Sequence, residues 1–217
     1  MNYFSEKDIR DIVAGVISGA GASVSAGQTV PVEISARHVH LTEEALSVLF
    51  GVGYQLSQKR DLSQPGQFLA QERVKLVTRK GEIDNVAVLG PARKQVQVEL
   101  SLTDTRSLGI SAPVKLSGDL SGGGDVLILG PAGMYEAKGS VIVAKAHVHM
   151  TPKDAENYGV SDGQTVRIRL DTARPATLDN VEVRVSRASK LAVHIDFDEA
   201  NAAAVDANTQ GILIKGR

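Results

Sequence analysis

The chain lacks cysteine and tryptophan, and it has few aromatic residues of any kind. It has 217 residues, of which 4% are aromatic and 42% are hydrophobic. The absence of cysteine excludes disulfides, thiolate metal ligands and a cysteine nucleophile. The low aromatic content means that the core has to consist mainly of Val, Ile, Leu and Ala. A chain of this length is long enough for one large domain or two small ones.

A strong net charge and long apolar segments are also missing. The formal net charge is -1, so no overall field attracts nucleic acid or an anionic membrane. No apolar run approaches the roughly 18 residues that a membrane-spanning helix requires. The N-terminus lacks the apolar block of a secretory signal. We therefore predict an intracellular soluble protein with no nucleic-acid partner and no membrane partner.

The first 20 residues have the pattern of an amphipathic helix. Its apolar positions follow the helical period, at Ile9, Ile12, Val13, Val16 and Ile17. Residues 21–30 begin with Gly, Ala and Ser, which is typical of a flexible linker. A helix of this kind either packs on the core or lies in the groove of a partner. The linker favours the second alternative.

After Val30 the hydrophobic pattern changes to a period of two residues. Segments such as RVKLVT, DVLIL and QTVRIRL are short, rich in β-branched residues and separated by Gly, Pro, Asp or Asn. Two helices are predicted among them, over residues 42–51 and 151–159, each with Thr as the N-cap and Gly at the end. Many short strands with few helices are typical of barrels and sandwiches.

The chain repeats one short motif, ARHVHL at residues 36–41 and AHVHM at residues 146–150. Each copy ends a predicted strand and precedes a Thr-capped helix. A second pair of segments also matches, KQVQVELSLTD and SKLAVHIDFDE, and its alignment places Glu99 opposite His194. We therefore predict a mainly β fold of two related β-barrels with short capping α-helices, derived from an internal duplication.

All five histidines and one glutamate occupy positions that the repeat makes equivalent. Residues i and i+2 of a strand point the same way, so both imidazoles of a His-Val-His motif can reach one ion. A lone histidine is more often a satisfied surface or core residue, but that explanation fits five repeated positions poorly. The nitrogen and oxygen donors suit Zn and also Co, Ni or Mn. The predicted metal ligands are His38, His40, Glu99, His147, His149 and His194.

Two further segments are candidates for binding an anion. Arg93 lies six residues before Glu99, so its guanidinium can share the face of that carboxylate and bind a phosphate. The alternative is a solvated arginine at the end of a loop. Residues 117–133 are the most glycine-rich stretch, but they lack the Lys-Ser/Thr ending of a P-loop. A nucleotide-triphosphatase is therefore not predicted.

These motifs together resemble the PduL-type phosphate acyltransferases (phosphotransacylases, phosphate propanoyltransferases) of bacterial microcompartments. The similarity covers about residues 31–217 and rests on both His-Val-His copies, GPAR, the SGD, GGG and GPAG segment, and VHIDFDEANA. It implies one barrel over residues 37–144 and a second over 31–36 plus 145–217. It also implies two divalent metal ions, with zinc expected, and the transfer of an acyl group, propanoyl being expected, between coenzyme A and inorganic phosphate.

The resemblance also implies roles for single residues. It places His38 and His40 at one ion, Arg93 at the phosphate, and the remaining predicted ligands at the second ion: Glu99, His147, His149 and His194. No residue can be assigned to coenzyme A, and Arg37 receives no role. Residues 4–19 resemble an encapsulation helix, which implies contact with microcompartment shell or core proteins and a place in the lumen of a microcompartment in the bacterial cytoplasm. A homo-oligomer is expected.

The predicted reaction is direct attack of phosphate, held by Arg93 and a metal ion, on a metal-polarised thioester. Two other classes remain as alternatives: a dinuclear metallohydrolase with thioesterase-like activity, and a non-catalytic metal-binding or shell component. Release of thiol that requires phosphate would indicate the transferase, whereas release in phosphate-free buffer would indicate the hydrolase. Loss of all activity on chelation would exclude the non-catalytic class.

Overall fold

A computed structural model describes residues 28–215 of the chain. The predicted N-terminal helix over 1–20, and residues 21–27 of the predicted linker, lie outside the described residues. Strand β1 (Thr29–Ser35) begins inside the range expected for the linker. The reason is that Val30 is fully buried and pairs with Gly211, so residues 29 and 30 extend the strand.

The described residues form fourteen strands and four short helices. The N-terminal half contains β2 (His38–His40), α2 (Glu43–Phe50), β3 (Gln58–Asp61), β4 (Phe68–Val77), β5 (Glu82–Gly90), β6 (Gln97–Leu100), α3 (Leu102–Leu108), β7 (Val114–Lys115), β8 (Gly124–Leu129) and β9 (Met134–Ala144). The C-terminal half contains β10 (His147–Met150), α4 (Pro152–Tyr158), β11 (Thr165–Leu170), β12 (Ala176–Val185), β13 (Ala192–Asp196), α5 (Phe197–Ala202) and β14 (Gln210–Lys215).

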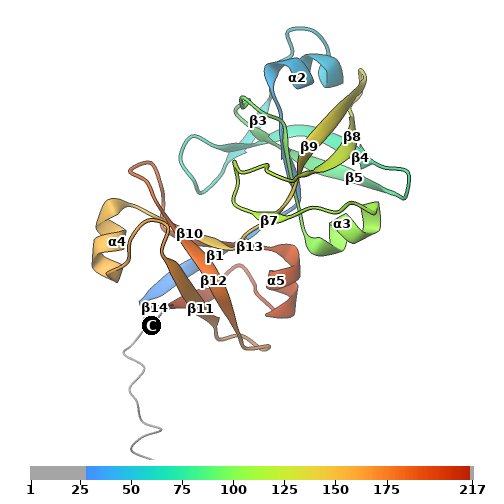
Figure 1. The fold of residues 1–217 in the computed structure, drawn as a ribbon. Helices are drawn as coiled ribbons and strands as arrows, with labels where there is room; N and C mark the ends of the chain where they lie inside the picture. The colour runs from blue at the N-terminus through green and yellow to red at the C-terminus, as the bar shows by residue number, and fades with distance from the viewer. Residues whose placement is uncertain (1–27, 216–217) are drawn as a thin grey trace, which may run out of the picture.

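Twelve of these strands form two closed barrels of six strands each, which lie side by side (Figure 1), and β3 and β7 pair with the outside of the N-terminal ring. The C-terminal barrel has the order β1-β13-β10-β12-β11-β14. In the N-terminal barrel, β8 pairs with both β4 and β9 and closes the ring β4-β5-β2-β6-β9-β8. Parallel and antiparallel pairs follow each other in the same way around both rings. The prediction of a mainly β fold with two related barrels is confirmed.

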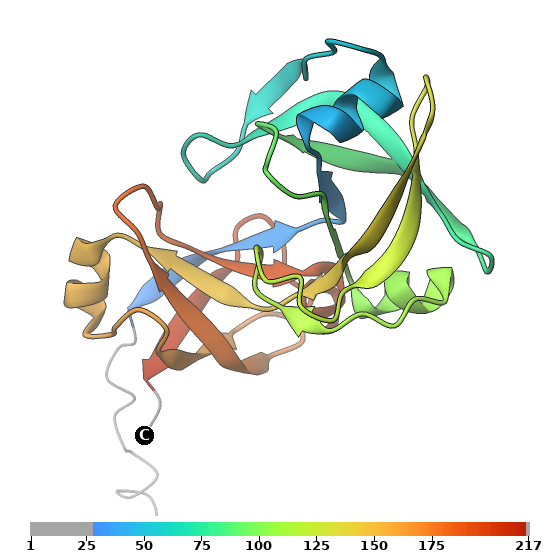
Figure 2. The same cartoon turned by 45° about the horizontal axis from the view of Figure 1, so that its top comes forward.

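Each His-Val-His strand is preceded in sequence by a strand of the other barrel. Strand β1 comes directly before β2 in sequence, but it pairs with β13 and β14 of the C-terminal barrel. Strand β9 comes directly before β10, but it pairs with β6 and β8 of the N-terminal barrel. The chain therefore crosses from one barrel to the other after β1 and again after β9 (Figures 1 and 2). Both His-Val-His motifs begin immediately after a crossing.

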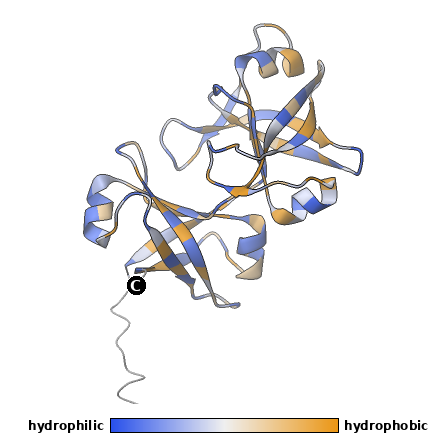
Figure 3. Ribbon diagram, viewed as in Figure 1, coloured by the Kyte–Doolittle hydropathy of each residue, from blue (hydrophilic) through white to orange (hydrophobic). Residues whose placement is uncertain are grey.

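Each barrel has its own apolar core, built by the alternation that the sequence shows. Apolar and polar positions alternate along the barrel strands (Figure 3). The central valines of the two His-Val-His motifs, Val39 and Val148, are both fully buried, each in the core of its own barrel. The histidines on either side of each valine therefore point away from that core, toward the region between the barrels.

Both helices predicted from the sequence are confirmed. The side chains of Thr42 and Thr151 cap α2 and α4, as predicted from their position before each helix. Gly159 ends α4 in the left-handed conformation, with φ of 60°, which glycine adopts without strain. Two further helices, α3 and α5, follow β6 and β13 directly, and the sequence did not predict them.

Candidate metal centre and anion site

The N-terminal barrel brings three predicted ligands together. Strand β2 runs antiparallel to β6, and His38 lies opposite Glu99 in this register. The two side chains face each other, with 3.6 Å between His38 Nε2 and Glu99 Oε1. Together with His40 they form a buried group whose donor atoms all lie within 4.8 Å of one another. We call His38, His40 and Glu99 the N-terminal group.

The C-terminal barrel repeats this arrangement with histidines alone. Strand β10 runs antiparallel to β13, which places His147 opposite His194. His147, His149 and His194 also have donor atoms within 4.8 Å of one another, and we call them the C-terminal group. The resemblance had implied that Glu99 belongs with these histidines. The structure places Glu99 opposite His38 through the pairing of β2 with β6, and its carboxylate also acts electrostatically on His147.

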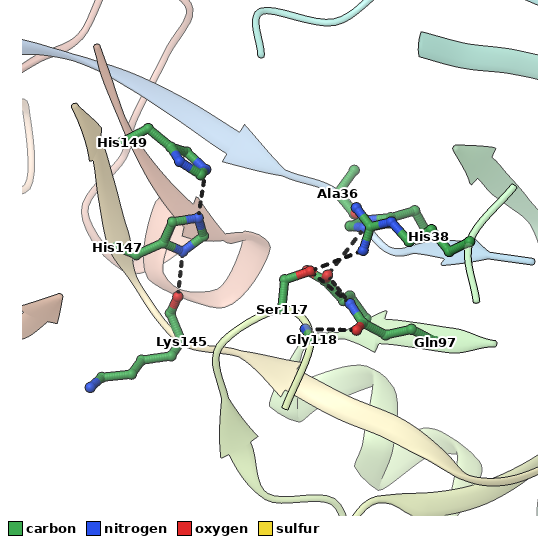
Figure 4. A network of polar contacts seen from close by, with 10 residues as sticks. Ala36, His38, Gln97, Ser117, Gly118, Lys145, His147 and His149 are labelled. Carbon is green, nitrogen blue, oxygen red and sulfur yellow. Dashed lines mark hydrogen bonds and ion pairs between the residues drawn. The ribbon is translucent and has the colours of Figure 1, made fainter. Parts of the chain in front are cut away.

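Backbone carbonyls orient the first histidine of each motif. His38 Nδ1 lies 2.7 Å from the carbonyl oxygen of Ala36, and His147 Nδ1 lies 2.8 Å from that of Lys145 (Figure 4). A carbonyl accepts a hydrogen bond, so Nδ1 carries the proton in both rings. The lone pair of Nε2 is then free, and a histidine held in this way commonly coordinates a metal ion through Nε2.

Burial keeps most of these histidines neutral. It lowers the pKa of His147 to about 4 and that of His149 to about 3, and the neighbouring histidines add to the effect. Burial, followed by the proximity of His38, lowers the pKa of His40 to about 2. Burial also disfavours charge on His38, but the Glu99 carboxylate outweighs it and raises that pKa. Glu99 is in turn held ionised, because its histidine neighbours outweigh the cost of burying it and lower its pKa.

Both groups fit a divalent cation. His147 Nε2 and His149 Nε2 lie 3.1 Å apart, so two ring nitrogens with lowered pKa values point at each other. Ligands on one tetrahedral zinc ion, with bonds of about 2.0–2.1 Å, are separated by roughly 3.3 Å. Within residues 28–215, the buried nitrogen His40 Nδ1 has no hydrogen-bond partner. Neutral imidazoles with a single carboxylate and no sulfur are donors that suit zinc.

Arg93 lies beside the N-terminal group, inside a polar network. Its Nη1 atom donates to Ser117 Oγ at 3.3 Å. The buried amide of Gln97 donates to Ser117 Oγ at 2.8 Å and to Glu99 Oε1 at 2.5 Å, and it accepts from the Gly118 backbone at 2.9 Å (Figure 4). The structure therefore connects Arg93 to Glu99 through Ser117, the first residue of the glycine-rich candidate segment, and through Gln97, which the sequence did not predict as a site residue.

A second cation from the other barrel lies near Arg93. Burial, together with the nearby guanidinium of Arg184, lowers the pKa of Arg93. Arg184 lies in β12, opposite His149, and it also lowers the pKa of both His147 and His149. Two guanidinium groups that lie near each other form a site that an anion would stabilise. One arginine comes from each barrel.

The sequence is similar to known proteins of one family. The family of phosphate propanoyltransferases matches residues 31–206. The chain belongs to the phosphate propanoyltransferase family. A phosphate propanoyltransferase of Alkaliphilus metalliredigens is 48% identical over 97% of this chain and 99% of its own length. Those of Priestia megaterium (48% identical; 96% of each chain) and Thermotoga maritima (49% identical; 79% of this chain and 82% of the relative) are similar to it as well.

The phosphate propanoyltransferase family is a family of acyltransferases, whose substrates must reach the site from solution. A groove of about 700 Å³ reaches Arg93 and is bordered by Thr42, Lys94, Tyr135 and Ser140. It lies on the N-terminal barrel, beside the first turn of α2. In the part of the chain that the structure describes, no helix has the length and apolar character needed to cross a membrane.

Proposed function

We propose that this chain transfers an acyl group, propanoyl being the preferred one, between coenzyme A and inorganic phosphate at a dinuclear metal centre. The observation that carries the proposal is the pairing of two three-donor groups, one from each barrel, with an arginine from each barrel nearby. The relatives are named phosphate propanoyltransferases, and this name describes the same transfer. Their names support the substrates, and the side chains of this chain support the metals.

The two groups would each hold one divalent ion, with zinc as the expected metal. Three protein donors at each ion leave a fourth position open, as catalytic zinc sites do. When bound, such ions supply positive charge that polarises a carbonyl and stabilises a developing oxyanion. No side chain of either group needs to become acylated for this reaction.

The chain's own residues would bind and orient the phosphate. A guanidinium holds a phosphate through two parallel hydrogen bonds, so Arg93 fixes both its position and its direction. Ser117 and Gln97 hold the Arg93 side chain beside Glu99. An oxygen of the phosphate then forms a bond with the acyl carbon, and the bond from that carbon to sulfur breaks. The sulfur leaves as the thiolate of coenzyme A, and the product is an acyl phosphate.

We also propose that residues 4–19 bind shell or core proteins of a bacterial microcompartment, so that the enzyme works in its lumen as a homo-oligomer. The apolar stripe from Ile9 to Ile17 and the linker after it support this proposal. Fusing residues 1–20 to a fluorescent protein should direct it into microcompartments in cells that make them. Diffuse fluorescence throughout the cytoplasm would contradict this role.

Replacing Arg93 tests the proposed phosphate site. In Arg93→Ala, we expect the KM for phosphate to rise roughly 10- to 100-fold, because a hydrogen bond to a charged group contributes about 1.5–3 kcal/mol. The measurement is thiol release from propanoyl-CoA as phosphate is varied, on protein of known metal content. Lys94→Ala is the matched control, since Lys94 is the adjacent exposed cation, and its KM should stay near that of the wild type.

Three outcomes of this assay would contradict the proposal. An unchanged phosphate KM in Arg93→Ala would remove Arg93 from the phosphate site. Thiol release by the wild type at full rate in phosphate-free buffer would show a hydrolase instead of a transferase. Activity that survives complete removal of metal would exclude the dinuclear centre.

A further inference from the structure

Glu33 lies against the C-terminal group from a strand on which no metal ligand was predicted. Strand β1 runs parallel to β13, and this register places Glu33 beside His194. The distance from Glu33 Oε2 to His194 Nε2 is 3.3 Å. Among residues 28–215 this is the only polar contact of that buried nitrogen.

The other barrel holds the Glu33 carboxylate in place. Ser63, in the loop between β3 and β4, donates its hydroxyl hydrogen to Glu33 Oε2. The next residue, Gln64, is buried and makes two hydrogen bonds with the backbone of Lys190, at 2.9 and 3.2 Å. Residues 63 and 64 therefore anchor this loop on the C-terminal barrel, next to the strand that carries His194.

The N-terminal group has no equivalent of this carboxylate. Strands β6 and β9 pair in parallel as β13 and β1 do, and Glu99 there lies beside Ile142. Ile142 thus occupies the place that Glu33 takes beside His194. The first histidine of each motif, His38 or His147, has a neutral carbonyl as its partner. In the C-terminal group, His194 is the ligand whose Nε2 atom lies beside an acidic side chain.

We propose that Glu33 is a positioning residue of the C-terminal metal group. It accepts a hydrogen bond from His194 Nε2, fixes the orientation of the ring and leaves Nδ1 to the metal ion. A carboxylate partner makes a metal-bound imidazole a stronger donor, and losing such a partner typically weakens metal binding roughly 10- to 100-fold. The C-terminal group therefore binds its ion more tightly than it would without Glu33. This inference rests on the proposed dinuclear centre.

Glu33 acts through His194 and is not itself a ligand. The three donor atoms within 4.8 Å of one another belong to His147, His149 and His194. Glu33 contacts His194 on its Nε2 atom, and it also accepts the hydroxyl of Ser63. Its Oε2 atom is therefore shared between Ser63 and His194.

Zinc affinity, measured by competition with a chelating dye on the full chain, tests this role. His40→Ala removes the N-terminal group as a complete site, so the protein reports the C-terminal group alone. In that background we expect Glu33→Ala to raise the Kd for zinc roughly 10- to 100-fold, and Glu33→Gln to raise it less, because the amide oxygen still accepts a hydrogen bond. In a His149→Ala background, which leaves the N-terminal group, Glu33→Ala should change the Kd by less than about threefold.

The outcomes separate this inference from the proposed function. If the wild type binds two zinc ions and Glu33→Ala leaves the Kd of the C-terminal group unchanged, the role of Glu33 is wrong and the dinuclear centre stands. If Glu33→Ala raises the Kd for zinc equally in both backgrounds, Glu33 acts on the whole fold and the positioning role is also wrong. If the wild type binds no zinc, both proposals fail. Glu156→Ala, which removes an exposed carboxylate, controls for the change in net charge.

Discussion

Arg37 stands next to a metal-ligand strand but serves a neighbouring helix. Its Nη2 atom lies 3.2 Å from Asp104 Oδ1. Asp104 is buried, and its carboxylate also accepts from the Ser101 backbone in the capping box that starts α3. Arg37 lies in the bend between β1 and β2, directly before His38. Its role is to neutralise a buried carboxylate that no sequence pattern connected with it.

Removing Arg37 should therefore destabilise the fold without affecting zinc binding. We expect Arg37→Ala to lower the free energy of unfolding by about 1–2 kcal/mol, because Asp104 keeps its charge and loses its partner. The cost stays at the low end, since the arginine side chain is 41% exposed and water can replace it. Urea unfolding of the zinc-free protein measures this difference. Adding Asp104→Asn to the variant should recover part of the loss; a further loss would contradict this account.

At the scale of elements, the last short helix carries an unusual titrating group. Glu199 completes the capping box of α5, where it accepts from the Asp196 backbone at 3.0 Å. Burial, followed by repulsion from the Asp196 and Asp198 carboxylates, raises the pKa of Glu199 to about 7. In the unfolded chain this carboxyl titrates near its ordinary value of 4.5. The folded state therefore holds this proton more strongly than the unfolded state does.

This difference predicts a loss of stability as the pH rises. A raised folded pKa contributes stability that is complete below pH 4.5 and disappears as the pH rises toward 7. Glu199→Gln keeps an acceptor for the capping box and removes the titration, so its stability should fall less between pH 5 and 7. Thermal unfolding of both proteins across this range measures the slopes. Glu44→Gln, at an exposed position of α2, should behave like the wild type, and equal slopes for Glu199→Gln and the wild type would refute the prediction.

What the sequence predicted at this scale depended on local signals. Helices α2 and α4 each begin after a Thr cap and end at a glycine, and both were predicted from these residues. Helices α3 and α5 have seven and six residues and follow a strand without a loop, so the strand pattern of the preceding residues hid them. The His-Val-His spacing alone sufficed to predict both histidine pairs, because residue parity in a strand is a local property.

The remaining site residues depend on pairing between distant strands. Glu33 reaches His194 only because β1 pairs with β13, and Arg184 reaches Arg93 only because the two barrels face each other. The assignment of Glu99 to the N-terminal group depends on the register of β2 with β6. No local pattern specifies such registers, so a single sequence does not predict these contacts.

At the scale of the whole molecule, β1 and β9 each close one barrel and lead directly into the other. Without β1 the C-terminal ring opens between β13 and β14, and without β9 the N-terminal ring opens between β6 and β8. Further contacts join the barrels, including the hydrogen bond from the Thr103 backbone to Asp198 at 2.8 Å and those of Gln64 with Lys190. This exchange of the chain between the barrels takes place directly before each His-Val-His strand.

Because of this exchange we expect both barrels to unfold in one cooperative transition. Val193 and Val98 are fully buried at equivalent positions of the two cores. Val193→Ala should lower the free energy of unfolding by about 2 kcal/mol, from the lost methyl groups and the cavity they leave. Val98→Ala, the matched change in the other barrel, should have a similar effect. In each variant, amide hydrogen exchange by global opening should accelerate in both barrels alike. Faster exchange confined to the substituted barrel, or two separate urea transitions, would show that the barrels are independent units.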